Sequence, residues 1–366
     1  MRYTLFIAML WVLCSCGQIQ VLPVVMPAKP LYVVAGEDGA VGGFGQTKIS
    51  LVDRSNWQVV GARNLATTYI EDGTHDGKNI WLGLSRDSNE DKYIVSKISY
   101  NLAEQHDYIT CMEPYALQRY KDSLIVACQE NGFVAVVMRI RLSDGKVMAQ
   151  RELRTKWGDM FLENSMLVGD ELLVQGSSHA AQNIVAFEIQ VLAADTLEWQ
   201  RNLDQKQTIS LRDSLVANGT TYIFNGTSAF PQENFLPFAD VYTYHEGETH
   251  FTPLPLIARN PQHGAIVGDV LYTVHNCWPA NVADNQKIFI YKTNLVTGES
   301  THWEYDYDTW NHIGDMATID GHIMITRFWA HDSSDDGLYE LDTTTGALVQ
   351  HANIEGATLI IDSASE

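Results

Sequence analysis

Short runs of alternating apolar and polar residues recur along most of this chain, and each run follows a tight-turn signal. Asn218-Gly219 and Asp320-Gly321 are typical of these signals, because Gly, Asn and Asp accept a positive φ at low cost. The runs that follow the signals are NIWLGLS (79–85), SLIVACQ (123–129), ELLVQGS (171–177), TTYIFNG (220–226), VLYTVHN (270–276) and HIMITRF (322–328). A period of two predicts half-buried strands, so the pattern predicts an antiparallel all-β protein.

A second pattern lies between these runs. In it, a predicted strand is followed by another turn and then by a shorter predicted strand. Its clearest copies are RIRLSDGKVMAQ (139–150), YKTNLVTGESTHW (291–303) and YELDTTTGALVQH (339–351). Seven copies occur at intervals of roughly 43 to 52 residues, the period expected for four-stranded propeller blades. We therefore predict one seven-bladed β-propeller of four-stranded antiparallel blades over residues 30–366.

The ends of the chain predict how the ring closes. The first copy has only LYVVAG (31–36) before its loop, so it lacks an innermost strand. The segment ATLIID (357–362) remains after the seventh copy. If this segment supplies the missing strand, the N- and C-terminal strands pair in one blade and no sheet edge stays open.

The three strand-turn-strand segments quoted above resemble those of the YVTN-type and quinoprotein-amine-dehydrogenase-like seven-bladed propellers. The resemblance covers nearly all of residues 30–366, and it rests on an Asp or Asn, a Thr/Ser-Gly turn and a following strand. It implies a fold and attaches no catalytic residue to it. Propellers host many unrelated functions, so function has to be argued from the site.

The first 16 residues have the order of an export signal. Arg2 precedes an apolar run over residues 5–13, which is too short to span a membrane. The sequence Leu13-Cys14-Ser15-Cys16 resembles the lipobox of bacterial lipoproteins, which implies that Cys16 carries the lipid and anchors the chain outside the cytoplasm at the cell envelope. An ordinary secretory signal cleaved nearby is the alternative. We expect a signal peptide (1–16), a tether (17–29) and the propeller (30–366).

Composition narrows the possible partners. The chain has 366 residues, 45% of them hydrophobic and 19% charged, which excludes a disordered chain. Its 24 Lys and Arg are scattered against 45 Asp and Glu, for a net charge of -21, so we expect no nucleic acid partner. Beyond the signal, the cysteines are Cys111, Cys128 and Cys277. Cys111 and Cys128 either bridge neighbouring strands or stay free and buried, and the sequence favours free thiols.

The predicted innermost strands place a polar residue at one early position in most blades. These residues are Glu71, Asn164, Asp213, His263 and Asp315, with Glu113 or Tyr115 less cleanly in the third blade. Innermost strands line the channel of a propeller, so we expect a ring at one channel mouth that attracts a cation or binds the donor groups of a polar ligand. The alternative is that these groups are solvated or bonded to neighbouring blades.

A second group of candidates comes from the strand ends of the sixth and seventh blades. Its members are His275, Asn276, Trp278, Trp310, His312, Arg327, Trp329 and His331. Aromatic faces with polar tips suit a flat or sugar-like ligand, although the Trp residues could equally pack between blades. His263, His275 and His312 could meet at a metal, but no metal-motif spacing is present and we expect none.

Three function classes remain open. The first is an envelope-anchored binding protein for a small molecule, glycan or protein partner. The second is an enzyme, either a metal-assisted lyase resembling the streptogramin-inactivating propellers, with His263, His312 and Glu71 as its best groups, or a quinoprotein-like oxidoreductase. The third is a scaffold that contacts an envelope complex through the Phe-rich loop 229–238. No nucleophile elbow, HExxH or paired CxxC motif is present, and the sequence names no cofactor.

Overall fold

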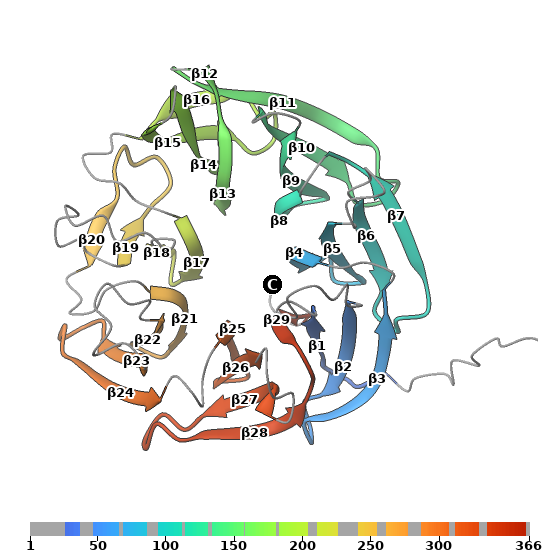
Figure 1. Ribbon diagram of the computed structural model, residues 1–366, viewed down its shortest axis with the longest axis vertical. Coiled ribbons are helices and arrows are strands. Elements are labelled where there is room, and N and C mark those ends of the chain that lie inside the picture. The colour runs from blue at the N-terminus through green and yellow to red at the C-terminus, as the bar shows by residue number, and fades with distance from the viewer. Residues whose placement is uncertain are drawn as a thin grey trace, which may run out of the picture.

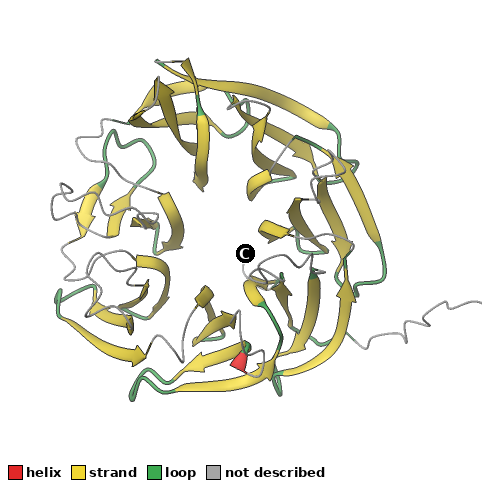
Figure 2. Ribbon diagram, in the orientation of Figure 1, coloured by secondary structure: helices red, strands yellow, loops and turns green. Residues whose placement is uncertain are grey.

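The computed structural model arranges seven antiparallel sheets as blades around a central axis (Figure 1). Strands make up every blade, with turns and loops between them (Figure 2). The prediction of an all-β, seven-bladed propeller is confirmed. The residues that the structure describes are 26–36, 47–65, 69–85, 94–111, 114–130, 134–156, 158–180, 183–203, 211–225, 241–254, 261–276, 287–306, 312–328 and 335–363.

The strands of the first four blades follow, from the channel outward. Blade 1 holds β29 (Ala357–Asp362), β1 (Pro30–Ala35), β2 (Lys48–Asp53) and β3 (Gln58–Asn64). Blade 2 holds β4 (Tyr69–His75), β5 (Asn79–Ser85), β6 (Ile94–Ser99) and β7 (Gln105–Ile109). Blade 3 holds β8 (Pro114–Tyr120), β9 (Ser123–Glu130), β10 (Val134–Arg141), β11 (Val147–Thr155) and a short fifth strand, β12 (Gly158–Asp159). Blade 4 holds β13 (Phe161–Val168), β14 (Glu171–Ala180), β15 (Asn183–Ala193) and β16 (Trp199–Asn202).

The remaining three blades repeat this order. Blade 5 holds β17 (Leu211–Ala217), β18 (Thr220–Asn225), β19 (Val241–Tyr244) and β20 (Thr252–Leu254). Blade 6 holds β21 (Pro261–Val267), β22 (Val270–Asn276), β23 (Lys287–Asn294) and β24 (Ser300–Asp306). Blade 7 holds β25 (His312–Ile319), β26 (His322–Phe328), β27 (Gly337–Leu341) and β28 (Leu348–Asn353).

The turn between the first two strands of a blade has the predicted chemistry. Asn218 and Gly219 have φ values of 52° and 75°, and Asp320 and Gly321 have φ values of 50° and 85°. Both residues of each pair therefore take the left-handed conformation that a two-residue hairpin turn requires. The turn residues thus fix where each innermost strand ends and the next strand begins.

The ring closes as the sequence predicts. The C-terminal strand β29 pairs antiparallel with β1, with Tyr32 opposite Ile361 and Val33 opposite Ile360. The Arg54 side chain is only 5% exposed, and its guanidinium contacts the carboxylate of Asp362 in β29. The strand β29 is thus held in blade 1 by a strand ladder and by a largely buried ion pair.

Apolar side chains on the faces of adjacent blades form the core. Tyr32 and Leu51 of blade 1 pack with Leu82 and Leu84 of blade 2, and all four are fully buried. The second and third strands of a blade are covered on both faces, which explains the continuous apolar run of β9. The core therefore follows the contacts between blades and leaves the polar residues of the innermost strands to the channel.

Cys111 and Cys128 form a disulfide, with their Cα atoms 6.0 Å apart. The expectation of two free thiols is therefore wrong. Cys111 lies just before β8, and β8 pairs with β9 so that Pro114 is opposite Cys128. The close approach depends on this pairing register, which the spacing of the two cysteines in the sequence does not reveal. Cys16 and Cys277 lie outside the described residues.

The predicted signal peptide and most of the predicted tether lie in residues 1–25, outside the described part of the chain. Over the residues that are described, there is no helix that is long and apolar enough to cross a membrane. The division into signal, tether and propeller stays a prediction at its first two segments.

Candidate functional site

Each of the seven innermost strands carries a β-bulge near its start. A bulge adds one residue without a partner on the neighbouring strand, and it redirects the side chains around it. We call the added residues the bulge positions, and they are Thr358, Glu71, Tyr115, Glu163, Arg212, Gln262 and Gly314. The next residue of each strand again has a partner, and we call these the ring positions: Leu359, Asp72, Ala116, Asn164, Asp213, His263 and Asp315.

In the structure Asn164, Asp213, His263 and Asp315 occupy equivalent positions, but in blade 2 the ring position is Asp72 rather than Glu71. The sequence alignment took Asp76-Gly77 as the turn pair of this blade. In the structure the Asp76 N–H donates to the Asn79 carbonyl at 3.0 Å, so the turn residues are Gly77 and Lys78. The alignment was therefore displaced by one residue in this blade.

Two ring carboxylates join neighbouring blades through backbone groups. The Asp72 Oδ1 atom accepts from the Gly73 N–H at 2.7 Å, and its Oδ2 atom accepts from the Leu117 N–H of blade 3 at 2.7 Å. Asp315 repeats this arrangement, since its two oxygens accept from the N–H groups of Met316 and of Ile360 in blade 1, at 2.7 and 2.9 Å. These bonds hold the inner strands of adjacent blades together at the channel.

Asn164 makes the same kind of contact with an amide. Its Oδ1 atom accepts from the Ser165 N–H at 2.7 Å, while its Nδ2 atom donates to the Leu211 carbonyl of blade 5 at 2.7 Å. The alternative interpretation of the ring, that its polar groups bond to neighbouring blades, therefore holds for Asp72, Asn164 and Asp315.

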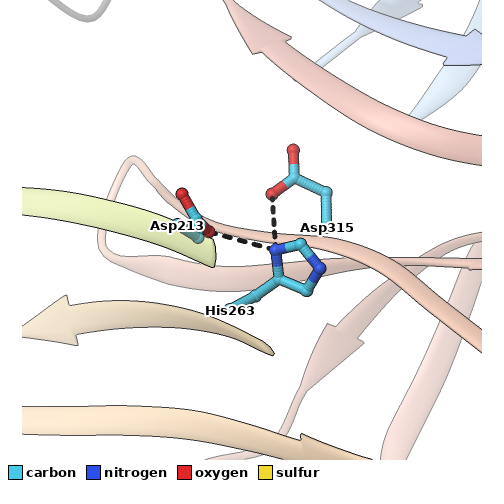
Figure 3. A group of neighbouring side chains, drawn as sticks. All are labelled: Asp213, His263 and Asp315. Carbon is cyan, nitrogen blue, oxygen red and sulfur yellow. Dashed lines mark hydrogen bonds and ion pairs between the residues drawn. The ribbon is translucent and has the colours of Figure 1, made fainter. Parts of the chain in front are cut away.

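His263 lies between two ring carboxylates (Figure 3). Its Nδ1 atom lies 3.0 Å from Asp213 Oδ2 and 3.9 Å from Asp315 Oδ1. The other oxygen of Asp213 accepts from the Ser214 N–H at 2.7 Å, which fixes the orientation of the carboxylate. All three side chains are partly exposed, at 33% for Asp213, 19% for His263 and 17% for Asp315. Blades 5, 6 and 7 thus place one imidazole and two carboxylates together.

Burial changes the acidity of two ring carboxyl groups. It raises the pKa of Asp72 to about 7, against the opposing effect of the two N–H donors, and repulsion from Asp213 and Asp315 acts in the same direction as burial. It raises the pKa of Asp315 to about 6, although His263 opposes the shift. Carboxyl groups that titrate near neutral pH are common at functional sites, and structural networks produce them too.

A cavity of about 790 Å³ opens beside these residues at the channel. Five carboxyl groups line it, and no Lys or Arg stands among the lining residues in the part of the chain that is described. The carboxyl groups are those of Glu71, Asp72, Glu163, Asp213 and Asp315. Gln118, Asn164 and Gln262 add amides, His263 adds an imidazole, and Tyr115, Phe161 and Phe328 add aromatic rings. The cavity is therefore rich in acceptors, with an apolar part at the aromatic rings. Arg212 also occupies a bulge position, and its side chain lies outside the described part of the structure.

Two members of the second predicted group, His275 and Arg327, lie inside their blades. His275 is buried inside blade 6, where its Nε2 atom lies 2.7 Å from Thr273 Oγ1 and its ring meets the edge of Tyr291. Arg327 is 4% exposed, and its guanidinium lies over the ring of Tyr339 within blade 7. Neither residue lines the cavity, because both side chains are buried within their blades.

The other members of that group cannot be placed at the cavity. Trp278, Trp310, Trp329 and His331 lie outside the described residues, as does the Phe-rich loop 229–238. Asn276 ends β22 and His312 begins β25, and their side chains are not described. The trio of His263, His312 and Glu71 considered for a lyase therefore stays a prediction.

Sequence reasoning missed Asp72 and the role of the bulge positions. Counting gives Asp72 once the turn is known to begin at Gly77, because each ring position in blades 2 to 7 lies five residues before the first turn residue with a positive φ. Gln262 and Glu163 were missed because an added residue in a polar segment leaves no mark on the alternating pattern.

Comparison with known proteins gives a fold and no family. No family model matches the chain, and no curated protein matches its sequence. Among solved structures, a candidate 6-phosphogluconolactonase from Bacteroides fragilis has a TM-score of 0.61 at 12% identity, with 90% of this chain and 97% of that chain covered. A periplasmic gluconolactonase from Pseudomonas aeruginosa has a TM-score of 0.56 at 11% identity, with 91% of this chain and 98% of that chain covered. The propeller domain of the Trilobed protease from Pyrococcus furiosus has a TM-score of 0.56 at 11% identity, with 89% of this chain and 95% of that chain covered.

At these identities the similarity demonstrates the β-propeller fold alone. The propeller of the Pyrococcus protease is described as having an open velcro topology, whereas in this chain β29 and β1 pair and close the ring. The narrower resemblance to YVTN-type and quinoprotein-like propellers stays a prediction. This chain is a seven-bladed β-propeller that carries an acidic, histidine-containing cavity at its channel.

Proposed function

We propose that this chain is an extracytoplasmic binding protein that holds a small, polar, donor-rich ligand in the cavity at the channel. One observation carries the proposal: five carboxyl groups line a single cavity of about 790 Å³. Ionised carboxylates only accept hydrogen bonds, so a complementary ligand supplies hydroxyl or ammonium donors. A sugar or an amino sugar has this chemistry.

The aromatic residues of the cavity lining support a ring-shaped ligand. Tyr115, Phe161 and Phe328 line the cavity together with the carboxylates. A sugar presents an apolar ring face and polar edges, so aromatic side chains can cover the face while carboxylates bind the hydroxyl groups. The bonds between blades at Asp72 and Asp315 keep the wall rigid, which lowers the entropy lost on binding.

Export and lipid anchoring at Cys16 are part of the same proposal. The disulfide between Cys111 and Cys128 supports export, because disulfides persist in oxidising compartments. The full-length chain should incorporate labelled fatty acid and sediment with membranes, and Cys16→Ser should lose both properties. A Cys16→Ser chain that stays labelled and membrane-bound would show that lipid is attached elsewhere.

The binding proposal is tested by calorimetry and thermal denaturation of the mature chain with three ligand sets: neutral sugars, amino sugars and sugar acids. We expect binding of neutral or amino sugars and rejection of the anionic sugar acids. Glu71→Gln and Glu163→Gln should weaken binding at least tenfold, since both carboxylates line the cavity and neither forms the bonds between blades described above. Asp122→Asn, in the exposed turn between β8 and β9, is the control. Preferential binding of sugar acids, or unchanged affinity in both Gln variants, would overturn the proposal.

Hydrolysis of a sugar lactone is the second candidate function. The imidazole of His263 and the carboxylate of Asp213 are 3.0 Å apart, and such a pair suits a general base with an orienting partner. Two of the similar structures are named for gluconolactones, and the acidic cavity favours a neutral lactone over a phosphorylated one. Proton release from glucono-lactone, lost in His263→Gln, would favour the enzyme. A rate equal to the spontaneous rate would exclude this reaction.

A further inference from the structure

The polar residues at the channel differ in what they bond. At Asp72 and Asp315, each of the two carboxylate oxygens meets a backbone N–H, one from its own strand and one from the next blade. Asp213 follows the pattern with Oδ1 only, since its Oδ2 atom faces the Nδ1 atom of His263 in the next blade. At Asp72 and Asp315 the second oxygen meets a backbone N–H of the next blade. At Asp213 the second oxygen, Oδ2, meets the imidazole nitrogen of His263 instead.

We propose that Asp213, His263 and Asp315 form a binding site for one divalent transition-metal ion at the channel. Each residue offers one ligand atom, and the three atoms lie within 4.8 Å of one another. They come from three consecutive blades, and they also line the cavity, so a bound ion would be open to the cavity on its remaining side. The inference does not depend on any organic ligand of the proposed binding function.

The two distances from the His263 imidazole suit such an ion after a small adjustment. In a tetrahedral site with ion-ligand distances of about 2.0 to 2.2 Å, two ligand atoms lie roughly 3.3 to 3.6 Å apart. The Nδ1 atom of His263 lies 3.0 Å from Asp213 and 3.9 Å from Asp315, so shifts of well under 1 Å bring both pairs into this range. The N–H donors of Ser214 and Met316 hold the two carboxylates in orientation, in the way that partners of metal ligands do.

The ligand set selects the class of ion. Mg²⁺ and Ca²⁺ prefer sites made entirely of oxygen, whereas an imidazole with two carboxylates suits Zn²⁺, Mn²⁺ and Co²⁺. The charges also agree, because a divalent ion neutralises the two carboxylates and leaves the imidazole neutral. Glu71, Asp72 and Glu163 line the same cavity and add attraction for a cation.

The alternative on the same residues is a hydrogen-bonded Asp-His-Asp cluster that holds blades 5, 6 and 7 together without an ion. The two interpretations differ in what a metal titration of the chelator-treated mature chain shows. With Co²⁺ as the probe, a site of this kind gives d-d absorption bands, and we expect one equivalent to bind. Competition by Zn²⁺ should remove the bands.

Variants locate the site. His263→Gln and Asp213→Asn should each lower the affinity for Co²⁺ and Zn²⁺ at least tenfold, while circular dichroism confirms that both variants are folded. His322→Gln is the matched control, because His322 is exposed and its Nδ1 atom lies 2.6 Å from a carboxylate, that of Glu340, away from the channel. Its affinity should equal that of the wild type.

Two results would overturn the proposal. The first is the absence of a saturable Co²⁺ equivalent in the wild-type chain after chelator treatment. The second is an unchanged affinity in folded His263→Gln together with a loss in His322→Gln, which would move the metal to the group of His322, Glu340 and His351. If either ligand variant does not fold, the paramagnetic shifts of wild-type histidine resonances in the Co²⁺ form decide the question, since only His263 should shift strongly if the site is correct.

Discussion

The Asp72 carboxyl group should make the stability of this propeller depend on pH. Burial raises its pKa from 3.8 to about 7, so between about pH 4 and pH 7 the folded chain holds a proton that the unfolded chain releases. Stability falls with rising pH wherever the folded state binds more protons. The free energy of unfolding should therefore contain a contribution that is present below about pH 4 and is lost as the pH rises to 7.

The size of this contribution follows from the shift. Three pKa units at 1.36 kcal/mol each give an upper value of about 4 kcal/mol. Asp72 is partly exposed to the cavity, and solvent there screens the charge, so we expect roughly half of this, about 2 kcal/mol. Asp72→Asn removes the titration. Asn has only one acceptor oxygen, so its NH₂ group faces one of the two backbone N–H donors and that hydrogen bond is lost. The loss costs about 1 to 3 kcal/mol and does not vary with pH.

The assay is urea denaturation of wild type and Asp72→Asn between pH 4.5 and 8, in chelator so that no metal contributes. The free energy of unfolding of the variant minus that of wild type should rise by about 2 kcal/mol over this range. The exposed turn variant Asp122→Asn reports the effect of losing one surface carboxylate. A difference between Asp72→Asn and wild type that is flat, or that falls as the pH rises, would refute the reasoning.

Three further substitutions test how the ring is held. Arg54→Met should destabilise the chain by about 3 kcal/mol and expose β29 to proteolysis, because it removes the largely buried guanidinium that contacts the carboxylate of Asp362. Gly314→Ala should cost about 3 kcal/mol in urea denaturation, because a Cβ there would lie 2.4 Å from the carbonyl oxygen of Thr358, a backbone atom that cannot turn aside. Cys128→Ser should cost about 3 kcal/mol, since its disulfide closes a loop with a sequence separation of 17, and reduction of the wild type should reproduce the loss.

The features predicted correctly from the sequence are those that local pattern determines. Alternation and turn pairs such as Asn218-Gly219 fix the strands, and their sevenfold recurrence fixes the number of blades. The closing strand followed from counting, because one blade lacked an inner strand and one strand remained. These arguments need no knowledge of which side chains meet across the ring.

The errors concern contacts that local pattern does not encode. Glu71 and Asp72 are both polar, so nothing in the alternation shows which of them is the added residue of the bulge. His275 and Arg327 stand near strand ends and suggested an exposed site, yet Thr273 and Tyr339 contact them inside covered strands. Sequence reasoning placed polar residues at the channel, and it took two buried polar side chains near strand ends for exposed ones.

Some channel residues both line the cavity and join neighbouring blades, and this decides which variants can reveal a function. A propeller without any ligand would still need Asp72 and Asp315, because they join neighbouring blades through backbone donors. Loss of ligand binding in their variants is therefore ambiguous, since the wall itself would loosen. Glu71 and Glu163 line the cavity from bulge positions. Glu163 accepts a hydrogen bond from Ser177 Oγ in its own blade at 2.8 Å, and Gln keeps an oxygen that can accept this bond. Because Gln has nearly the same size and shape as Glu, the Gln variants should keep the melting temperature within about 2 °C while affinity falls. If binding instead falls only when the melting temperature falls, these carboxyl groups serve the architecture, and the cavity is not the ligand site.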